Sequence, residues 1–445
     1  MRATLDHGLF LGVTFLLVCA LGAPAHAQQP ALTLTLRQAV ELALKNNPAV
    51  LVTAADVQEA AAARTRHLAA LLPHVTADAL VNRQNRNLAV VGLSIPNIPT
   101  VVGPFSFMDF RVSFSQSLVD RQAYHEWKAS AKAEESAQMT HQDSRDLVIR
   151  QAAGLYLASE AGAAELEAAE ARVVTAAALE KLARDQRDQQ LATGLDVVRA
   201  QVQLARERQN ALAARDAYQT SLIALARFLG LDLGQPLELA ESLRFVHVEA
   251  PDVEGALTRA LAMRPDYQAL ARERDSLDEQ QHAVHARDLP RLSLSGDYGA
   301  LGRNFGSLPG IGEVQATVSV SVFDRDRSGA TEELRARRTR LDEQLNDLAR
   351  GIEQELRTAI LNLDLEEQEV KVADAAVELG ERELAMTEDR FRNGVSDNIE
   401  VVAAQETVAR VHDQRIAALA RHADARMALV RALGNTEDSF ARYMR

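Results

Sequence analysis

The chain has few aromatic residues, a single cysteine and no excess of basic residues. Aromatics make up 4% of its 445 residues, which is low for a globular enzyme. A formal charge of −13 leaves no basic face for a nucleic-acid backbone and argues against nucleic acid as a partner. The only cysteine is Cys19, so stability must come from packing and oligomerisation and not from disulfides. Beyond the N-terminal segment no apolar run reaches 18 residues, which argues against a transmembrane helix.

The first 27 residues have the pattern of a secretory signal peptide. Arg2 gives a weak positive start, Leu9–Leu21 is an apolar stretch too short to span a bilayer, and Ala25-His26-Ala27 has a small-x-small cleavage pattern. Val18 stands before Cys19 where a lipoprotein would need a small residue. We therefore expect a signal peptide at 1–27, and an exported chain that is either soluble or crosses an outer membrane as β-strands.

The rest of the chain contains an internal sequence repeat. Gln190–Gly230 aligns without gaps on Gly394–Gly434, with Val197-Val198-x-Ala200-Gln201 facing Val401-Val402-x-Ala404-Gln405. Self-similarity at a fixed offset indicates that a structural unit is duplicated. It predicts a first structural repeat at 28–230, a second at 231–434 and a C-terminal tail at 435–445.

Each repeat has the same predicted order of elements, which makes the protein mainly α with a small β part. A first helix, expected at 36–70 and 252–288, is followed by a β-hairpin at about 74–119 and 291–323. A long helix at about 123–189 and 326–392 comes next, and a short helix at about 195–230 and 398–433 ends the repeat. At 1.5 Å per residue each long helix would extend about 100 Å, so that two stacked short helices could lie alongside it.

The hairpin strands alternate apolar and polar residues, as Phe110, Val112 and Phe114 do with Arg111 and Ser113. This pattern suits a tilted outer-membrane strand, and it suits a soluble hairpin with one buried face equally well. Four strands cannot close a barrel, which needs about eight, so membrane strands would have to be pooled between chains. The loops Gly92–Pro104 and Gly299–Gly312 differ in length between the repeats, and we expect them at the exposed tips of the hairpins.

The second long helix carries two apolar heptad stripes on opposite sides. The stripes are Leu363, Val370, Val377, Leu384 and Phe391, and Leu365, Val372, Leu379 and Met386. Residues two apart lie about 200° apart around a helix, so this helix needs a neighbour on each flank. A wall of helices with water on both surfaces, such as a tube, has this property. A soluble bundle, the alternative, would gather its apolar residues toward one core.

These features resemble the TolC-like outer-membrane efflux protein family. The resemblance rests on Leu36–Pro48, Arg264-Pro265-Asp266, and Phe391–Gly394 followed by Glu400–Gln405, in order and duplicated. It implies a trimer with a twelve-stranded barrel in outer-membrane lipid, continued by a periplasmic α-helical barrel. It further implies a periplasmic adaptor and an inner-membrane transporter as partners, in a tripartite efflux pump or type I secretion system. Leu231–Pro251, with a possible strand at Arg244–Val248, could contribute to a collar around the helical barrel, because the tail is short.

The turns between long and short helices are the expected place for a gate. The resemblance implies acidic residues around the constriction at the second turn. Glu400 occupies the first such position and Ala403 the second, with Asp397 nearby and Asp196 as the counterpart in the first repeat. The turn residues themselves differ, with Gln190 in the first repeat and Gly394 in the second. The simpler interpretation is that these carboxylates cap helices or favour the helix dipole.

The sequence contains no recognisable residue pattern for enzymatic chemistry. His282-x-x-His285 lacks a third ligand nearby in sequence, and Gly302-x-x-x-Gly306 lies between strands where no phosphate loop fits. Asp120 and Asp324, at the strand-to-helix junctions, are expected as N-caps, and the arginines at 335, 337, 338 and 340 as a solvated helix face. We expect no enzyme, no metal and no cofactor. Two functions remain, a passive export duct and a periplasmic coiled-coil adaptor without a pore.

Overall fold

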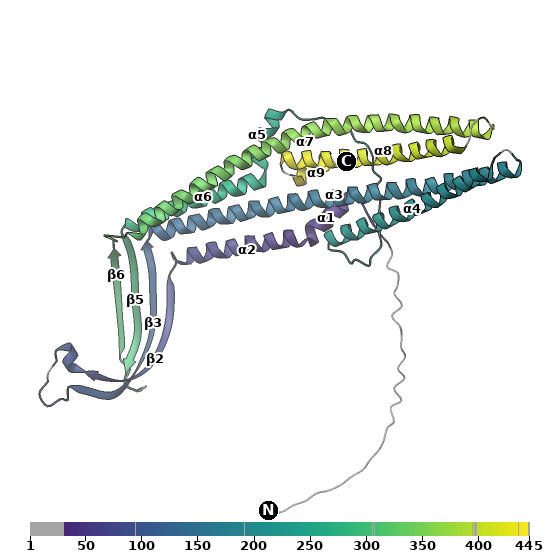
Figure 1. Ribbon diagram of the computed structural model, residues 1–445. Coiled ribbons are helices and arrows are strands. Elements are labelled where there is room, and N and C mark those ends of the chain that lie inside the picture. Colours follow the sequence, from purple (N-terminus) through teal and green to yellow (C-terminus); the bar gives the residue numbers. More distant parts are fainter. Residues whose placement is uncertain are drawn as a thin grey trace, which may run out of the picture.

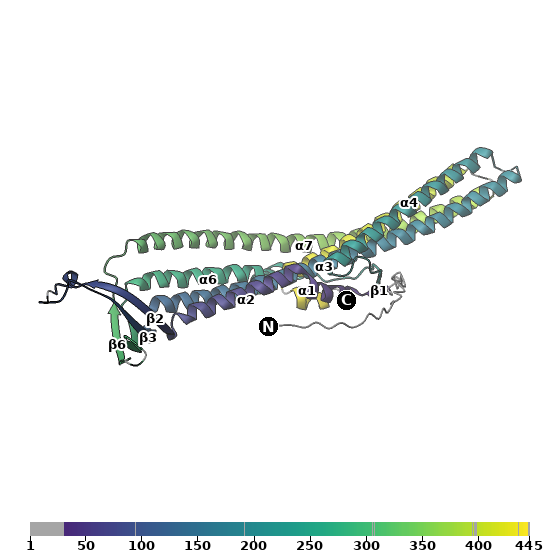
Figure 2. The ribbon, with the colours of Figure 1, turned by 90° about the horizontal axis from the view of Figure 1, so that it is seen from below.

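The computed structural model describes residues 31–443 except 94, 191, 305, 307, 394, 396, 397 and 435. The expected signal peptide at 1–27 lies outside the described residues. Long helices form an elongated bundle, and a four-stranded sheet projects from one end of it (Figure 1). Seen from below, the helices run together to the opposite end, where the two helical turns form the tip (Figure 2). Among the helices of the described part of the chain, none combines the length and apolarity needed to cross a membrane.

Both halves of the chain run through the same strands and α-helices in the same order and differ in the position of a short 3-10 helix. The first half contains β1 (Leu32–Leu34), α1 (Leu36–Asn46), α2 (Pro48–Ala69), β2 (His74–Asn87), the 3-10 helix η1 (Leu88–Val91), β3 (Val101–Val119), α3 (Arg121–Asp188) and α4 (Gly194–Phe228). The second half contains β4 (Leu237–Leu239), α5 (Val253–Met263), α6 (Pro265–His285), η2 (Ala286–Asp288), β5 (Arg291–Gly302), β6 (Gly310–Ser319), α7 (Asp326–Arg392) and α8 (Asn398–Leu433), with α9 (Thr436–Tyr443) at the end.

The first helix of each half is broken in two, and our expectation of single helices at 36–70 and 252–288 was wrong. Asn47 and Arg264 adopt extended backbone angles, with ψ of 127° and 121°. Each precedes a proline, whose ring disfavours the helical conformation of the residue before it. The proline then occupies the first position of the next helix, where its missing N–H costs nothing.

The break allows α2 and α4 to stack end to end beside α3. The side-chain amides of Asn46 and Asn47 donate to the carbonyls of Leu229 and Phe228, each at 3.1 Å. These carbonyls lie at the C-terminus of α4, where the helix has no partners of its own for them. Gly230 ends α4 at φ +67°, and a side chain there would meet Asn46 at 2.8 Å. The expected stacking of α2 and α4 along the long helix is therefore confirmed (Figure 1).

The two hairpins form one antiparallel sheet in the order β2-β3-β5-β6. The join between the halves is the pairing of β3 with β5, in which Val112 lies opposite Tyr298. The second hairpin, expected to extend to about residue 323, ends with β6 at Ser319. In the first hairpin, β2 covers 14 residues.

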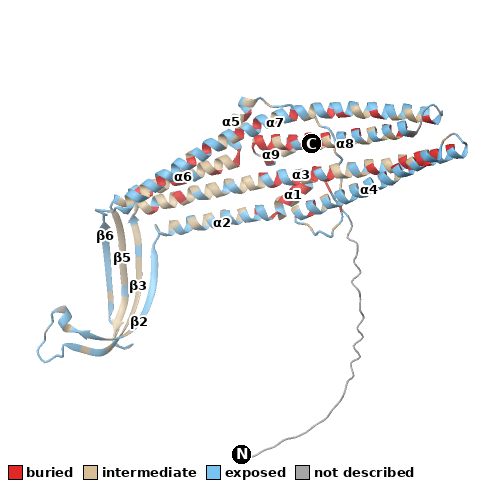
Figure 3. Ribbon diagram, in the orientation of Figure 1, coloured by how far each residue is buried: buried red, intermediate tan, exposed pale blue. Residues whose placement is uncertain are grey.

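The main core lies at mid-height of the bundle, where α1, α3, α4 and α8 meet (Figure 3). Tyr156 of α3 is fully buried there, and its hydroxyl donates to the carbonyl of Leu34 at 2.9 Å. Leu32–Leu34 pairs in parallel with Leu237–Leu239, so the strand of the 231–251 segment is not at Arg244–Val248 as expected. The start of the second repeat therefore pairs with the start of the first, a long-range contact that local patterning does not reveal.

The strand-to-helix junctions are capped differently in the two halves. Asp120 is the N-cap of α3 as expected, and its carboxylate accepts from the amide of Ala123 at 3.0 Å. Asp324 lies one residue before the N-cap of α7, which is Arg325, and accepts from the amide of Asp326 at 3.0 Å. Its expected N-cap position was therefore wrong by one residue, although the carboxylate still satisfies an N-terminal amide of the helix.

Candidate functional site

One face of the four-stranded sheet is apolar and exposed. Val81, Val112, Tyr298, Val314 and Val318 share this face by the strand register, and they are 52–74% exposed. No residue within β2, β3, β5 or β6 is buried (Figure 3). An apolar face of this kind lacks a protein core to cover it, which marks it as a contact surface for lipid or another chain.

The opposite face of the sheet is polar. Nε of Arg111 lies 2.9 Å from Asp109, and a terminal nitrogen of Arg111 lies 3.0 Å from Asp297 on the neighbouring strand. A shallow hollow beside them is lined by His74, Thr76, Ser113, Ser115, Ser295, Asp297, Glu313 and Gln315, with Phe114 and Gly296. The polar side chains suit contact with water. The sheet thus has an apolar face and a polar face.

The sheet is open at both edges. Within the described residues β2 pairs only with β3, and β6 pairs only with β5. The outer edges therefore present unpaired N–H and C=O groups, which are not tolerated in a lipid environment. Because β2 and β6 run in opposite directions, β6 of one copy can continue the antiparallel order with β2 of a second copy.

At the far end of the bundle the first helical turn is built around Thr193. Thr193 is the N-cap of α4 and forms a capping box with Asp196. The backbone N–H and the hydroxyl of Thr193 donate to Asp196 at 2.9 and 2.7 Å, and these hydrogen bonds hold the pKa of Asp196 below its usual value. Gln190 occupies the left-handed region at φ +63°, a conformation that glycine adopts at less cost. In the first repeat the acidic residue therefore acts as a capping residue.

The second turn leaves its acidic residue more exposed. Glu400 lies in the first turn of α8, its side chain is 50% exposed, and it lies 3.8 Å from Arg390. Gly394 and Asp397, which we also assigned to this turn, lie outside the described residues. The two turns are held together by a buried cluster of Leu179, Phe391 and Val401. The fold therefore brings Asp196 and Glu400 to the same end of the molecule, on separate turns.

The two stripes of α7 have different surroundings. In the first stripe Leu363 and Val370 are 1% exposed, and with Phe391 they belong to clusters packed by α8. The second stripe is uncovered, with Leu365, Val372, Leu379 and Met386 at 50–70% exposure. Only one of the two expected neighbours of this helix is therefore supplied by the chain itself.

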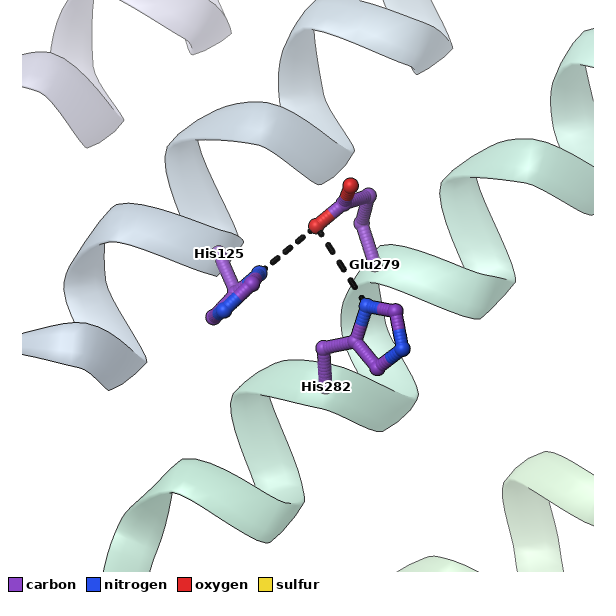
Figure 4. A group of neighbouring side chains, drawn as sticks. All are labelled: His125, Glu279 and His282. Atoms are coloured by element: carbon purple, nitrogen blue, oxygen red, sulfur yellow. Dashed lines mark hydrogen bonds and ion pairs between the residues drawn. The ribbon is translucent and has the colours of Figure 1, made fainter. Parts of the chain in front are cut away.

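Two clusters of charged residues bring together parts of the chain that our sequence analysis left apart. Arg431, which is almost fully buried, lies 2.5 Å from Asp143 and 3.4 Å from Asp266, and so links α8 to α3 and α6. Near the sheet, His125 of α3 meets Glu279 and His282 of α6 (Figure 4). The sequence singled out His282 with His285. The only pointer to His125 was its place just after β3, the strand that pairs with β5.

Several solved membrane-protein structures are similar to this one. The structure is similar to a membrane protein from Pseudomonas aeruginosa, with a TM-score of 0.79, 20% identity and coverage of 90% of this chain and 93% of the other. It is similar to the CmeC outer membrane channel of Campylobacter jejuni, with a TM-score of 0.78, 14% identity and coverage of 92% and 89%. For the outer membrane protein VceC from Vibrio cholerae the TM-score is 0.77, the identity 17% and the coverage 90% and 96%. At such identities the likeness concerns the fold.

The sequence itself decides the family. No curated protein sequence is significantly similar to the chain. The family model described as outer membrane efflux protein matches residues 39–231 and 256–435, which is most of the chain. The alternative of an adaptor without a pore is therefore not favoured. With its mainly helical fold and small sheet, the chain belongs to the outer membrane efflux protein family and is an efflux channel protein of the outer membrane.

Proposed function

We propose that three copies of this chain form the outer-membrane duct of a tripartite efflux pump or type I secretion system. The observation that carries the proposal is the sheet with one apolar face and two open edges. Three such sheets, joined β6 to β2, make a closed antiparallel barrel of twelve strands with the apolar face toward lipid. Closure removes every open edge, which a spanning β-structure requires.

The helices extend the barrel on the other side of the membrane. The ring that joins β6 to β2 of the next copy also brings α7, which follows β6, beside α2 and α4 of that copy. The uncovered stripe of α7 then faces α4 of that copy, where Leu212 and Ile223 are exposed at the same level along the bundle. Such a heterologous contact generates a closed ring when the rotation closes. Helices of 68 and 67 residues would carry the tube about 100 Å into the periplasm.

The tip of this tube is the proposed gate and the end nearest the partners. Threefold symmetry brings three copies of each turn around the axis, with Glu400 and Asp397 on the second turn and Asp196 on the first. A periplasmic adaptor and an inner-membrane transporter would deliver the cargo, small molecules or proteins, at this end. The polar face of the sheet, with its arginine and acidic side chains, would line a hydrated exit.

The assembly can be tested directly on the full-length expressed protein. After detergent extraction from outer-membrane fractions, native mass measurement should report three chains, and the reconstituted trimer should conduct ions across a planar bilayer. Recovery of the chain in the soluble periplasm, or a monodisperse monomer from the membrane, would contradict the proposed duct.

A further inference from the structure

Two histidines and a glutamate meet where the helices join the sheet. His125 lies in the second turn of α3, shortly after β3, and Glu279 and His282 lie in the last turns of α6, shortly before β5. Nδ1 of His125 is 2.7 Å from Oε2 of Glu279, and Nδ1 of His282 is 3.7 Å from the same oxygen. All three ligand atoms lie within 4.8 Å of one another, and the three side chains converge from the two helices (Figure 4).

This geometry is close to that of a metal-binding site. Zinc bonds to histidine nitrogen and carboxylate oxygen are about 2.0–2.2 Å long, so two ligands of a tetrahedral zinc ion lie roughly 3.4 Å apart. The observed separations of 2.7 and 3.7 Å fall on either side of that value. Small side-chain rotations would therefore admit an ion between them. Glu279 and His282 are three residues apart on one helix and so share one face.

The helices that carry the three side chains are joined by two side-chain to backbone hydrogen bonds. The hydroxyl of Ser276 on α6 donates to the carbonyl of Ala129 on α3 at 2.8 Å, and Ser276 is 4% exposed. The hydroxyl of Ser136 on α3 donates to the carbonyl of Ala269 on α6, also at 2.8 Å. Rigid supporting elements of this kind pre-organise a ligand set.

The neighbouring charged side chains determine which carboxylate oxygen of Glu279 is available to bind an ion. Lys128 lies 3.9 Å from Oε1 of Glu279 and sits over the ring of Tyr124 at 5.0 Å. Oε2 faces the histidines, so the carboxylate can bind an ion through one oxygen while the other stays near the lysine. His282 is 60% exposed, which gives an ion in solution access to the site.

We propose that His125, Glu279 and His282 bind a borderline divalent cation of the Zn²⁺ class. Two imidazoles and one carboxylate form a donor set that occurs in zinc sites, whereas Mg²⁺ and Ca²⁺ prefer oxygen donors alone. With three protein ligands the fourth position is left to water. The ion would tie α3 of the first half to α6 of the second half directly beneath the paired strands β3 and β5, and would stiffen the junction of helices and sheet.

The test measures metal binding by the detergent-solubilised protein, purified without a histidine tag and freed of metal with a chelator. Zn²⁺ titration by calorimetry should give one high-affinity ion per chain. H125A and H282A should each weaken that binding by at least about tenfold, since even the loss of an outer-shell partner costs about 10–100-fold. Co²⁺ used as a spectroscopic probe should give the absorption bands of a tetrahedral site in the wild type, and these bands should be lost in H125A and H282A.

H285A is the matched control, because His285 is exposed on the same helix and outside the cluster. It should bind Zn²⁺ as the wild type does. Native mass and circular dichroism verify that each variant is folded. The absence of a stoichiometric ion in the wild type would overturn the proposal, and so would equal affinities in H282A and the wild type or an equal loss in H285A. None of these results depends on transport activity, so the outcome is separate from that of the proposed duct.

Discussion

Single carboxylates in this protein have different roles according to their surroundings. Asp196 is committed to the capping box with Thr193, whereas Glu400 is half exposed at the first turn of α8. Glu160 of α3 is 5% exposed in the middle of the bundle, beside Glu241 and Arg244. Burial, followed by the negative charge of Glu241, raises the pKa of Glu160 to about 7. The same side-chain chemistry therefore serves capping, a proposed gate and a buried site that titrates near neutrality.

We predict that Glu400→Gln lowers the cation selectivity of the reconstituted channel. A ring of three carboxylates at the constriction would attract cations and hold polyvalent ones, and the amide removes that charge without changing the size of the side chain. The measurements are reversal potentials in salt gradients and block by polyvalent cations in planar bilayers, with trimer assembly unchanged. Glu406→Gln, on an exposed position further along α8, is the control. Unchanged selectivity and block would restrict Glu400 to a role at the helix terminus.

We predict that the protein loses stability between pH 4.5 and pH 7 through Glu160. Because the folded-state pKa is raised above the ordinary value, the folded state binds the proton more tightly than the unfolded state. The stabilising effect is complete below the unfolded pKa and is lost as the pH rises through 7. Glu160→Gln should therefore raise the free energy of unfolding at pH 8 by about 2 kcal/mol relative to the wild type, after allowance for solvent screening. The unfolding temperature should rise accordingly.

The measurement for Glu160 compares unfolding temperatures at pH 5 and pH 8. The wild type should be less stable than the variant at pH 8, and the difference should be much smaller at pH 5. Glu167→Gln changes an exposed glutamate on the same helix and should leave the pH profile of the wild type unchanged. A parallel pH profile for the wild type and Glu160→Gln would show that Glu160 is ionised without cost.

Among whole elements, α7 shows most clearly what one chain leaves incomplete. Its bounds agree with the long helix expected at about 326–392, and its first stripe packs against α8. Its second stripe stays in contact with solvent along four heptad positions. A long amphipathic surface of this kind is stabilised by packing and not by helix propensity. The element therefore calls for a partner helix that the same chain does not provide.

We predict that the double substitution Val372→Gln with Leu379→Gln weakens the trimer. Both side chains are about two-thirds exposed in the single chain and would be buried between copies in the assembled ring. Burying a polar amide there without a hydrogen-bond partner costs roughly 1–3 kcal/mol per site. Native mass measurement over a dilution series should show a larger fraction of monomer. Glu378→Gln, exposed on the adjacent side of the same helix, should assemble as the wild type does, and equal trimer fractions in all three proteins would place the interface elsewhere.

At the scale of the whole molecule the sheet and the helical tip lie at opposite ends (Figure 1). Their separation gives the protein a direction, because only the sheet has the apolar face suited to lipid. The loops that join the strands of each hairpin lie at the end of the sheet farthest from the helices. They also differ in length between the two halves, as exposed loops often do.

We predict that these hairpin loops are exposed at the cell surface. An epitope inserted after Asn97 or after Gly306 should be labelled on intact cells, since neither position contributes to a buried cluster. An epitope after Val395, at the helical tip, is the matched control and should be labelled only after the outer membrane is ruptured. Labelling in the reverse pattern would invert the orientation of the channel.

Local patterns in the sequence were sufficient for the elements and for the duplicated order. The bounds of α7 and the alternation of Phe110, Val112 and Phe114 could be predicted because a period of 3.6 or 2 depends only on neighbouring residues. The breaks at Asn47 and Arg264 also follow from local chemistry, the proline after each, although we expected the helices to continue through them. The second stripe of α7 predicted a second neighbouring helix, but the stripe alone does not show which helix that is.

The partners of each element were decided only by the tertiary structure. Periodicity reports which face of an element is apolar, and not which distant segment covers it. The pairing of Leu32–Leu34 with Leu237–Leu239 and the contact of Arg431 with Asp143 join residues far apart in sequence. His125 meets Glu279 because β3 pairs with β5 and thereby brings α3 beside α6. The family and the channel were therefore accessible from the sequence, whereas the candidate metal site was not, because its ligands become neighbours only when the two halves pack together.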